Sequence, residues 1–139
     1  MEIKPYGVYQ EEEVLELYGS VGWLNYTARP EMLKAAFTSS LMVLGARVNG
    51  KLAGLIRAVG DGASILYIQD ILVHPDYQRQ GIGRKLLLEM IDRYPRVYQT
   101  VLMTDDTPKT AAFYRSCGFS PEKDLGLCAY LRIKGLSAD

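Results

Sequence analysis

The sequence contains few residues of the kinds that build metal sites and disulfide frameworks. Among its 139 residues there are two cysteines, Cys117 and Cys128, and one histidine, His74. Two cysteines this far apart indicate neither a zinc site nor a redox pair, and we expect no metal cofactor. Cys117 fits a small packed thiol better than a nucleophile. His74 fits a turn residue better than a general base, because Pro75 follows it directly.

The sequence also lacks an excess of positive or negative charge, and it lacks long apolar segments. Sixteen Lys and Arg residues balance sixteen Asp and Glu residues, so no broad basic surface is available to bind nucleic acid. No apolar segment approaches the roughly 20 residues that a membrane-spanning helix needs. Residues 1–5 lack the apolar segment of a secretory signal. We therefore expect a cytoplasmic protein without a nucleic-acid or membrane partner.

The chain is long enough to bury an ordinary core, and we expect one domain over residues 1–139. Apolar periodicity and turn residues predict the element order β-α-α-β-β-β-α-β-α-β. The expected strands cover residues 3–8, 41–48, 51–59, 64–73, 97–103 and 128–133. The expected helices begin at residues 11–13, 30, 82 and 108, and the last three end near residues 39, 94 and 117.

Two features decide how these strands pair. Asn49-Gly50 between two apolar segments is typical of a type I′ hairpin turn, which predicts an antiparallel pair. The strand–helix–strand unit from Ser64 to Met103 needs a crossover connection, which predicts a parallel pair. The fold class is therefore α/β (α+β) with a mixed sheet. This sheet is mostly antiparallel, with a central parallel strand pair and helices on both faces.

The segment from Ile71 to Leu88 carries the strongest functional signal. An apolar strand ends at His74-Pro75-Asp76, and a polar loop ending in Gly81-Ile82-Gly83 opens a helix. N–H groups at a helix start point toward a ligand there, and the helix dipole favours negative charge. The glycines let a phosphate approach the main chain. Three basic side chains in and after the loop add positive charge, so the pattern indicates a phosphate site.

The glycine spacing separates several kinds of phosphate loop. A Walker A loop needs Gly-Lys followed by Ser or Thr, whereas Arg84-Lys85-Leu86 follows Gly83. A dinucleotide loop needs a third glycine at the position of Leu86. The pattern that fits is Gln-x-x-Gly-x-Gly, formed by Gln78, Gly81 and Gly83 directly after a strand. It closely resembles the acetyl-CoA pyrophosphate loop of the GNAT-type N-acetyltransferase superfamily.

A second segment strengthens this resemblance. The superfamily's other signature is Asn-x-x-Ala-x-x-Phe-Tyr followed by a Gly-Phe helix ending, and Phe113-Tyr114 and Gly118-Phe119 match it. Thr107 and Thr110 depart from it, since they stand where asparagine and alanine are usual. The resemblance implies the GNAT acyl-CoA N-acyltransferase fold, and its specific motifs lie between residues 66 and 119.

The resemblance also implies acetyl-CoA as cosubstrate and a set of residues that bind it. In the superfamily, the strand before the loop separates from its neighbour and offers main-chain groups to the pantetheine arm and thioester. The Val73 N–H would lie near the carbonyl oxygen. The implied cofactor-binding residues are Ile71, Leu72, Val73, Gln78, Arg79, Gln80, Gly81, Ile82, Gly83, Arg84, Thr107 and Phe113.

Catalytic and acceptor residues follow from the same resemblance. Tyr114 matches the tyrosine that protonates the departing sulfur, and the ordinary phenol pKa of about 10 suits transfer to a thiolate. The first helices and their loop close over the acceptor in this superfamily. Trp23, Tyr26 and Arg29 would form that wall here, with Asp61 as a further candidate.

The general base is left open by the sequence, although the resemblance implies a carboxylate near residues 67–71 that works through a water chain. Side chains alternate along a strand, so Gln69 and Asp70 face opposite sides, and the carboxylate is the one that can accept a proton. Asp70 is therefore the candidate base, with a structural pairing to a nearby arginine as the equal alternative. Asp105-Asp106 could also meet a cationic amine, but the pair fits a solvated turn better, in which Asp106 caps the next helix.

The predicted function is transfer of an acetyl group from acetyl-CoA to a primary amine of a small molecule or peptide. We expect direct attack in a ternary complex, because no activated serine or cysteine constellation is present. The alternative is an acetyl-CoA-binding sensor or partner-regulated module with little turnover. By fold analogy, the last apolar strand could pair across a homodimer.

Overall fold

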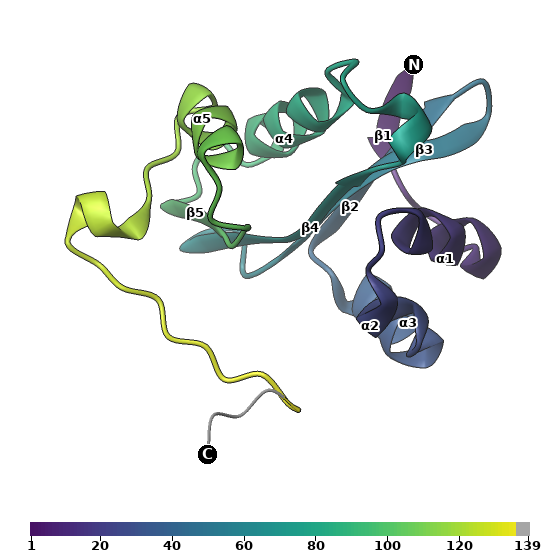
Figure 1. The fold of residues 1–139 in the computed structure, drawn as a ribbon, viewed down its shortest axis with the longest axis horizontal. Helices are drawn as coiled ribbons and strands as arrows, with labels where there is room; N and C mark the ends of the chain where they lie inside the picture. Colours follow the sequence, from purple (N-terminus) through teal and green to yellow (C-terminus); the bar gives the residue numbers. More distant parts are fainter. Residues whose placement is uncertain (136–139) are drawn as a thin grey trace. The chain divides into compact units, whose positions relative to one another are not determined.

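The computed structural model describes residues 1–135, which form two compact units. The first unit covers Met1–Met103 and the second begins at Thr104. The first unit contains β1 (Glu2–Pro5), α1 (Glu11–Ser20), α2 (Leu24–Thr27), α3 (Pro30–Ser39), β2 (Met42–Val48), β3 (Lys51–Val59), β4 (Ile65–Val73), the 3-10 turn η1 (Pro75–Tyr77), α4 (Ile82–Arg93) and β5 (Gln99–Leu102). The second contains α5 (Pro108–Ser116) and the 3-10 turn η2 (Glu122–Leu125) (Figure 1).

One sheet runs through the first unit in the order β1-β2-β3-β4-β5. Its neighbouring strands are antiparallel except for β4 and β5, which are parallel. The hairpin between β2 and β3 turns at Asn49 and Gly50, whose φ angles are 50° and 81°. A type I′ turn requires positive φ at both of these positions. The predicted hairpin, crossover and mixed sheet are confirmed.

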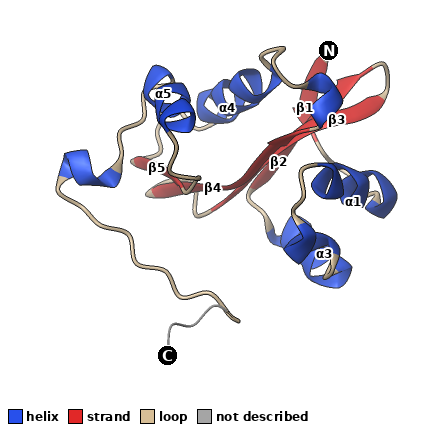
Figure 2. Cartoon of the chain, viewed as in Figure 1, coloured by secondary structure: helices blue, strands red, loops and turns tan. Residues whose placement is uncertain are grey.

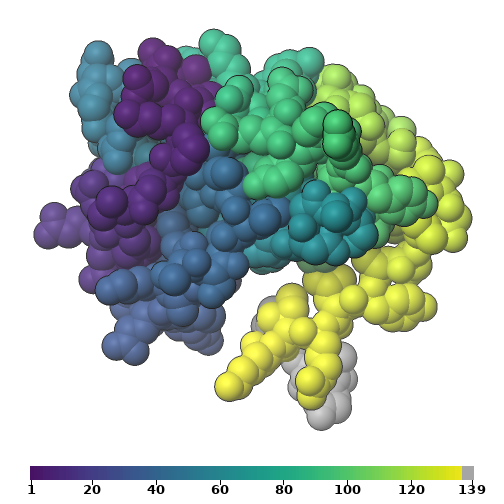
Figure 3. Space-filling model, turned by 180° about the vertical axis from the view of Figure 1, so that it is seen from behind, coloured from purple at the N-terminus to yellow at the C-terminus, as the bar shows by residue number. Residues whose placement is uncertain are grey.

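Helices cover both faces of this sheet, as the sequence predicts. α1 and α3 lie on one face and α4 on the other (Figures 1 and 2). Three acidic residues begin α1 and suit the positive end of its dipole. Val14, Leu17 and Tyr18 of α1 join Leu33 and Phe37 of α3 in one core cluster. In Figure 3 the purple residues of the N-terminal part pack beside the blue residues that follow them.

On the opposite face, α4 buries Ile82, Leu86, Leu87 and Met90, which lie on one side of the helix. This helix contacts β2, β3 and β4. As a result, β3 is covered on both faces, and its residues from Leu52 to Ala58 are buried. A strand covered on both faces is a place where a charged side chain needs a partner.

Four sequence expectations differ from the structure. Residues 128–133, expected as a last strand, form no strand within the described residues and are drawn as loop in Figure 2. An apolar pattern gives strand propensity, but a strand also needs a neighbour for its main-chain hydrogen bonds. The parallel pair therefore lies at one end of the sheet, not in its centre. β1 and β5 are shorter than predicted, and the short α2 was not predicted.

In the second unit, α5 ends near Gly118, whose φ of 92° lies in the left-handed region that commonly ends helices. The predicted helix at 108–117 is confirmed to within one residue. Cys117 follows the helix and is half-buried. Across residues 1–135, no helix has both the length and the hydrophobicity to span a membrane.

Candidate active site

The loop after β4 is held in shape by its own side chains. His74 ends the strand: its N–H donates to the Ala53 carbonyl at 2.8 Å, and its Nδ1 accepts the Asp76 N–H at 3.1 Å. Gln78 then points back, and its Nε2 donates to the Val73 carbonyl at 2.9 Å. The chain therefore leaves β4, makes one turn at η1 and returns to the end of the strand before α4 begins. His74 is a turn residue here, as expected.

The start of α4 presents main-chain N–H groups. Arg79 and Gly81 have positive φ angles of 64° and 80°, and Gly81 caps α4 without a side-chain hydrogen bond. The Lys85 N–H donates to the Gly81 carbonyl at 3.0 Å as the first bond of the helix. Helix geometry therefore gives the Ile82 and Gly83 N–H groups no acceptor in a preceding turn. Left-handed residues leading into a helix start form a concave set of N–H groups that binds anions.

Gly81 and Gly83 leave space beside these N–H groups. A Cβ added at Gly81 would meet no other residue within 4 Å, and one added at Gly83 would meet Val73 Cγ2 at 3.8 Å. Internal packing therefore does not explain why glycine stands at these positions. Gly81 is explained by its positive φ, which other residues rarely adopt. At Gly83 the glycine leaves the main chain open to the approach of another group.

A third glycine, Gly54 of β3, sets how closely α4 approaches the sheet. A Cβ there would lie 3.1 Å from Ile82 Cγ2 and 3.2 Å from both Leu86 Cδ1 and the Leu72 carbonyl oxygen. Real side chains seldom pack this tightly, so glycine is required for α4 to begin where it does. Gly54 was not among the predicted site residues. Its signal was present, because a glycine inside a strand indicates a bulge or a close approach of another segment.

β4 has an open edge beyond Ile68. Its ladder with β5 covers residues 65–68 of β4 and residues 99–102 of β5, and among residues 1–135 the strand partner of residues 70–73 is β3. The bond from the His74 N–H to β3 fixes the alternation along this antiparallel ladder. Main-chain groups of Leu72 therefore face β3, while those of Ile71 and Val73 face the open edge. The separation of the two strands that the resemblance implies is present.

A register shift lies in the middle of this edge. Arg57 pairs with Asp70 and Ala58 pairs with Ile68, so Gln69 is an extra residue in β4. Gln69 is exposed, whereas Asp70 is buried on the face covered by α1. The extra residue thus leaves the Gln69 amide exposed at the open edge, while the Asp70 carboxylate is buried on the face that α1 covers.

Asp70 accepts three hydrogen bonds within the first unit. Its Oδ2 accepts from Arg57 Nε and from the Tyr18 hydroxyl, each at 2.8 Å, and its Oδ1 accepts from the Tyr26 hydroxyl at 3.0 Å. Asp70 is 2% exposed and Arg57 is 4% exposed. Arg57 Nη1 also donates to Ser40 Oγ at 3.2 Å. Of the two alternatives that the sequence left for Asp70, pairing with an arginine is the geometry present.

The electrostatics of this cluster keep its phenols protonated. Burial, and then the charge of Asp70, raises the pKa of both Tyr18 and Tyr26 above the ordinary 10.0. Both tyrosines therefore donate to the carboxylate at neutral pH. Each buried ion has an opposite charge and hydrogen bonds, which is the condition under which ions are tolerated in a core.

Arg57 and Tyr18 were not among the predicted site residues. The signal for Arg57 is a single charged residue within the apolar strand Leu52–Val59, since a buried charge requires a partner. The signal does not say which acidic residue that partner is, because this depends on strand register. Tyr18 carries no such signal, because its spacing with Val14 and Leu17 is that of an ordinary core residue.

The predicted acceptor residues lie around α2. Trp23 and Tyr26 are half-buried against the core cluster, with ring centroids 5.9 Å and 5.3 Å from that of Tyr18. Arg29 is exposed, and its Nη1 donates to the Asn25 carbonyl at 3.2 Å. Tyr26 is the member of this group that bonds to Asp70. The structure thus brings one predicted acceptor residue to the predicted base.

Asp61, the further acceptor candidate, holds the turn before β4. Its carboxylate accepts the Ser64 hydroxyl at 2.6 Å and the main-chain N–H groups of Ala63, Ser64 and Ile65. These bonds, with the Ser64 hydroxyl first, hold the pKa of Asp61 well below its ordinary value. They explain this aspartate as a turn residue.

In the second unit, Thr107 caps α5. Its Oγ1 accepts the Thr110 N–H at 3.2 Å and donates to Thr110 Oγ1 at 3.0 Å. The capping role expected at Asp106 therefore belongs to its neighbour, because the side-chain oxygen must stand at the residue just before the helix. Both threonines that depart from the family signature take part in this cap.

Tyr114 lies on α5 among aromatic rings of the same unit. Its centroid is 5.0 Å from that of Phe113 and 5.9 Å from that of Phe119, both in edge-on geometry. Burial raises the pKa of Tyr114 above the ordinary 10.0. The phenol is therefore protonated at neutral pH, which is the state that a proton donor needs.

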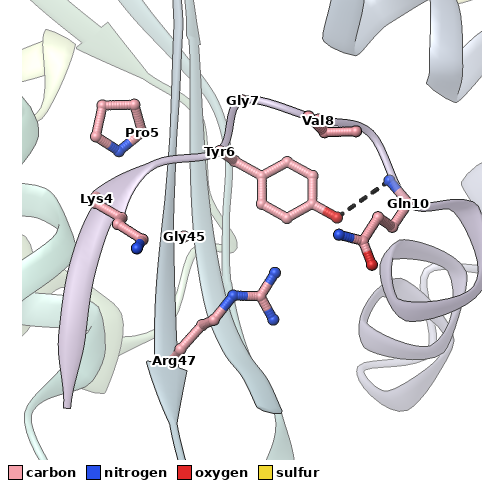
Figure 4. Close-up of a pocket in the computed structure, with 8 residues that line it drawn as sticks. All are labelled: Lys4, Pro5, Tyr6, Gly7, Val8, Gln10, Gly45 and Arg47. Atoms are coloured by element: carbon pink, nitrogen blue, oxygen red, sulfur yellow. Dashed lines mark hydrogen bonds between the residues drawn. The ribbon is translucent and has the colours of Figure 1, made fainter. Parts of the chain in front are cut away.

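A small pocket of about 130 Å³ lies in the first unit, at β1, the segment that leads from it to α1, and β2 (Figure 4). It is lined by Lys4, Pro5, Tyr6, Gly7, Val8, Gln10, Gly45 and Arg47. The Tyr6 hydroxyl donates to Glu13 and accepts the Gln10 N–H, and Arg47 binds both oxygens of Glu13. The side chains of Tyr6, Glu13 and Arg47 thus satisfy one another. Their hydrogen bonds hold the start of α1 to the sheet, which gives these residues a structural role.

Comparison with known proteins identifies the family. The GNAT acetyltransferase domain model matches residues 39–121, which include β4, the glycine loop and α5. The chain belongs to the GNAT acetyltransferase family. The resemblance seen in the two motifs is confirmed, and acetyl transfer is the general activity of this family.

Individual relatives agree with this assignment. A GNAT-family acetyltransferase of Streptococcus pneumoniae has a TM-score of 0.87 and 40% identity, over 96% of this GNAT chain and 98% of that one. An uncharacterized N-acetyltransferase of Pyropia yezoensis is 28% identical over 81% of this chain and 66% of its own length. The chain spans between about half and two thirds of the length of the curated relatives it matches. An N-acetyltransferase of Thermoplasma acidophilum, solved with coenzyme A, shares the fold at a TM-score of 0.67 and 19% identity, over 86% of this chain and 89% of that one.

Proposed function

We propose that the protein transfers an acetyl group from acetyl-CoA to a primary amine of a small molecule or peptide. The observation that carries this proposal is the start of α4 in a chain of the GNAT family. There, N–H groups without helical acceptors lie beside a glycine that packing does not require. A pyrophosphate is an anion that matches such a cradle. The coenzyme A bound by the Thermoplasma acidophilum relative supports the same cofactor.

In this proposal the main chain of residues 79–84 binds the pyrophosphate, and Arg79 and Arg84 add positive charge. Gln78 shapes the loop through its bond to the Val73 carbonyl, and Gln80 lies at the exposed rim. The pantetheine arm follows the open edge of β4, where the main-chain groups of Ile71 and the N–H of Val73 are available, since the Val73 carbonyl is bonded to Gln78. From the family motif, we assign Thr107 and Phe113 to contacts with the same arm.

The reaction then needs three events at the thioester. A neutral amine nitrogen attacks the carbonyl carbon, and the Val73 N–H stabilises the oxyanion that forms. The bond between carbon and sulfur breaks, and the thiolate takes a proton from the Tyr114 hydroxyl. The amine loses its proton to water, and Tyr114 regains one from water. Atoms and charges balance without a covalent enzyme intermediate.

A second candidate is an acetyl-CoA sensor with little turnover. The observation that favours it concerns Thr107, which stands where the family usually has an asparagine that binds the cofactor arm. The Thr107 hydroxyl is instead engaged in capping α5. A cofactor arm that lacks this contact is oriented less firmly for chemistry. The sensor and the enzyme differ in whether coenzyme A is released.

Two measurements test the proposal. Calorimetry should show heat when acetyl-CoA binds, and an assay for free coenzyme A should detect release with at least one amine of a panel. The panel is spermidine, kanamycin, glucosamine 6-phosphate, lysine and a peptide with N-terminal alanine. Tyr114→Phe should lower kcat about a hundredfold, since a positioned acid contributes at least that much, while the Kd for acetyl-CoA stays within about twofold.

Absence of heat would remove the assignment of the glycine loop. Heat without release from any amine would favour the sensor. Tyr114→Phe with the kcat of the original protein would show that another group, or water, protonates the sulfur.

A further inference from the structure

We propose that Tyr26 binds the acceptor amine through its phenol oxygen, and that Asp70 is the residue that positions Tyr26, not the general base. This inference rests on the proposed acetyl transfer and deepens it. It names the group that receives the amine N–H and gives the buried Asp70–Arg57 pair a role in that recognition.

Asp70 itself is placed where no substrate can touch it. It is 2% exposed, and its two oxygens accept from Arg57, Tyr18 and Tyr26 at 2.8, 2.8 and 3.0 Å. A general base needs an oxygen within hydrogen-bond reach of the amine, directly or through one water, and a carboxylate that is 2% exposed has almost no surface for that water. Oδ2 faces two buried donors, and Oδ1 is covered by the hydroxyl of Tyr26. The carboxylate therefore reaches an amine through Tyr26 alone.

Tyr26 connects this buried charge to the exposed side of the sheet. Its ring is half-buried against Tyr18, with centroids 5.3 Å apart. Its oxygen also accepts a hydrogen bond from Nε2 of Gln69 at 3.4 Å. Gln69 is the exposed extra residue at the open edge of β4, two residues before Ile71 and its edge-facing main chain. Tyr26 thus stands beside the edge where the thioester is proposed to bind.

The hydrogen bonds fix which role the Tyr26 hydroxyl can play. A phenol has one hydrogen to donate and lone pairs that accept. The hydrogen is committed to Asp70 and one acceptor position to Gln69, so the position that remains accepts a hydrogen bond. A primary amine presents N–H groups that match it. An acceptor that offers only lone pairs meets no donor at this oxygen.

A proton relay from the amine through Tyr26 to Asp70 is unfavourable in this cluster. Burial and the charge of Asp70 raise the pKa of Tyr26, so its hydroxyl holds its proton. Protonating Asp70 would leave the Arg57 guanidinium buried without its counter-charge. The groups bonded to the carboxylate are Arg57 from β3, Tyr18 from α1 and Tyr26 from α2, and Gln69 of β4 is bonded to the Tyr26 hydroxyl. None of these groups would stabilise a protonated Asp70 better than the ionised form that it now binds.

The test compares two Tyr→Phe variants on the same carboxylate. Tyr26→Phe removes the proposed amine acceptor, and Tyr18→Phe removes the buried hydroxyl on the other oxygen. With the best amine of the panel, Tyr26→Phe should raise the KM for the amine about three- to tenfold. Its kcat and its KM for acetyl-CoA should change less than about twofold. Tyr18→Phe should lower the denaturation midpoint and raise the KM for the amine less than Tyr26→Phe does, because the Tyr26 hydroxyl stays on Asp70.

A pH profile of kcat/KM separates positioning from a relay. Because the amine loses its proton to water, the rising limb should have the same midpoint in Tyr26→Phe as in the original protein. A shift or loss of that limb overturns the proposal in favour of a relay. Circular dichroism confirms that each variant is folded.

The remaining outcomes are also decisive. An unchanged KM for the amine in Tyr26→Phe, or an equal rise in Tyr18→Phe, overturns this inference and leaves the acetyl transfer standing. Should the original protein release no coenzyme A with any amine of the panel, the proposed function fails first, and this inference fails with it.

Discussion

Arg57 and Asp70 are buried ions, and each is tolerated because of the other. Asp70→Asn leaves a guanidinium that is 4% exposed beside a neutral amide. We expect a loss of about 3–5 kcal/mol in the free energy of unfolding, because one uncompensated buried charge remains. The double variant Asp70→Asn/Arg57→Met should recover part of this loss, since neither new side chain needs a counter-charge. Urea denaturation at pH 7 measures the free energy of unfolding of the original protein and of both variants.

An exposed ion pair in the same sheet is the control. Lys4 and Glu2 lie 3.0 Å apart with side chains 65% and 67% exposed. Glu2→Gln should cost less than about 1 kcal/mol, because water screens such pairs. If Asp70→Asn costs as little as Glu2→Gln, then water reaches the inner pair, and the burial argument for Asp70 is lost.

Glu13 gives the protein a pH dependence of defined sign. Hydrogen bonds from Arg47 hold the pKa of the Glu13 carboxyl below its ordinary value of 4.5. A lowered pKa in the folded state means that the ionised form stabilises the fold. This contribution is complete above about pH 4.5 and is lost as the pH falls through the folded-state pKa.

The variant Glu13→Gln should therefore be less stable than the original protein at pH 7, and the difference should shrink in acid. Denaturation midpoints measured at neutral pH and at about pH 3, below the ordinary carboxyl pKa, would show this. Glu12→Gln, at an exposed neighbour in the same helical turn, should show a smaller difference. A constant difference between Glu13→Gln and the original protein at all pH values would contradict the assignment.

At the scale of elements, the start of α4 separates stability from binding. Gly83→Ala would add a methyl group whose nearest contact outside the helix is Val73 Cγ2 at 3.8 Å. Alanine loses less backbone entropy than glycine in a helix, so unfolding should cost up to about 1 kcal/mol more. The same methyl group enters the space that we assign to the pyrophosphate. The Kd for acetyl-CoA should therefore rise about tenfold or more.

Gly54→Ala is the matched control for this helix. Its methyl group would lie 3.1–3.2 Å from atoms of Ile82, Leu86 and Leu72, so it should destabilise the fold by about 1–3 kcal/mol. Denaturation and calorimetry on both variants give the comparison. A Gly83→Ala protein that binds acetyl-CoA as tightly as the original would show that no phosphate approaches the main chain at that position.

These elements also show which features the sequence alone predicts and which it does not. The hairpin at Asn49-Gly50 and the glycine loop after β4 were predicted because their signals are local: turn residues, spacing and helix-start chemistry. The pairing of Arg57 with Asp70 was open, because it depends on a register shift that adds one residue to β4. The strand expected at residues 128–133 was wrong for a related reason. Its apolar pattern can be read from the local sequence, whereas the presence of a neighbouring strand to pair with cannot.

At the scale of the whole molecule, exposed apolar side chains are concentrated late in the chain. Leu125, Leu127, Tyr130, Leu131 and Ile133 are between 48% and 92% exposed. A segment with strand propensity and unsatisfied apolar surface tends to pair with another chain. The balance of sixteen positive and sixteen negative residues means that net charge does not oppose association. We therefore expect the homodimer that the fold analogy suggested.

Light scattering coupled to size-exclusion chromatography should give about twice the chain mass of 15.6 kDa. The double variant Tyr130→Lys/Leu131→Lys should return the mass of one chain, because two buried charges would oppose the apolar contact. Tyr98→Lys changes another aromatic residue, 86% exposed and outside this segment, and should leave the mass unchanged. A single-chain mass for the original protein at every concentration would exclude the homodimer. If the double variant keeps a dimeric mass, another surface forms the contact.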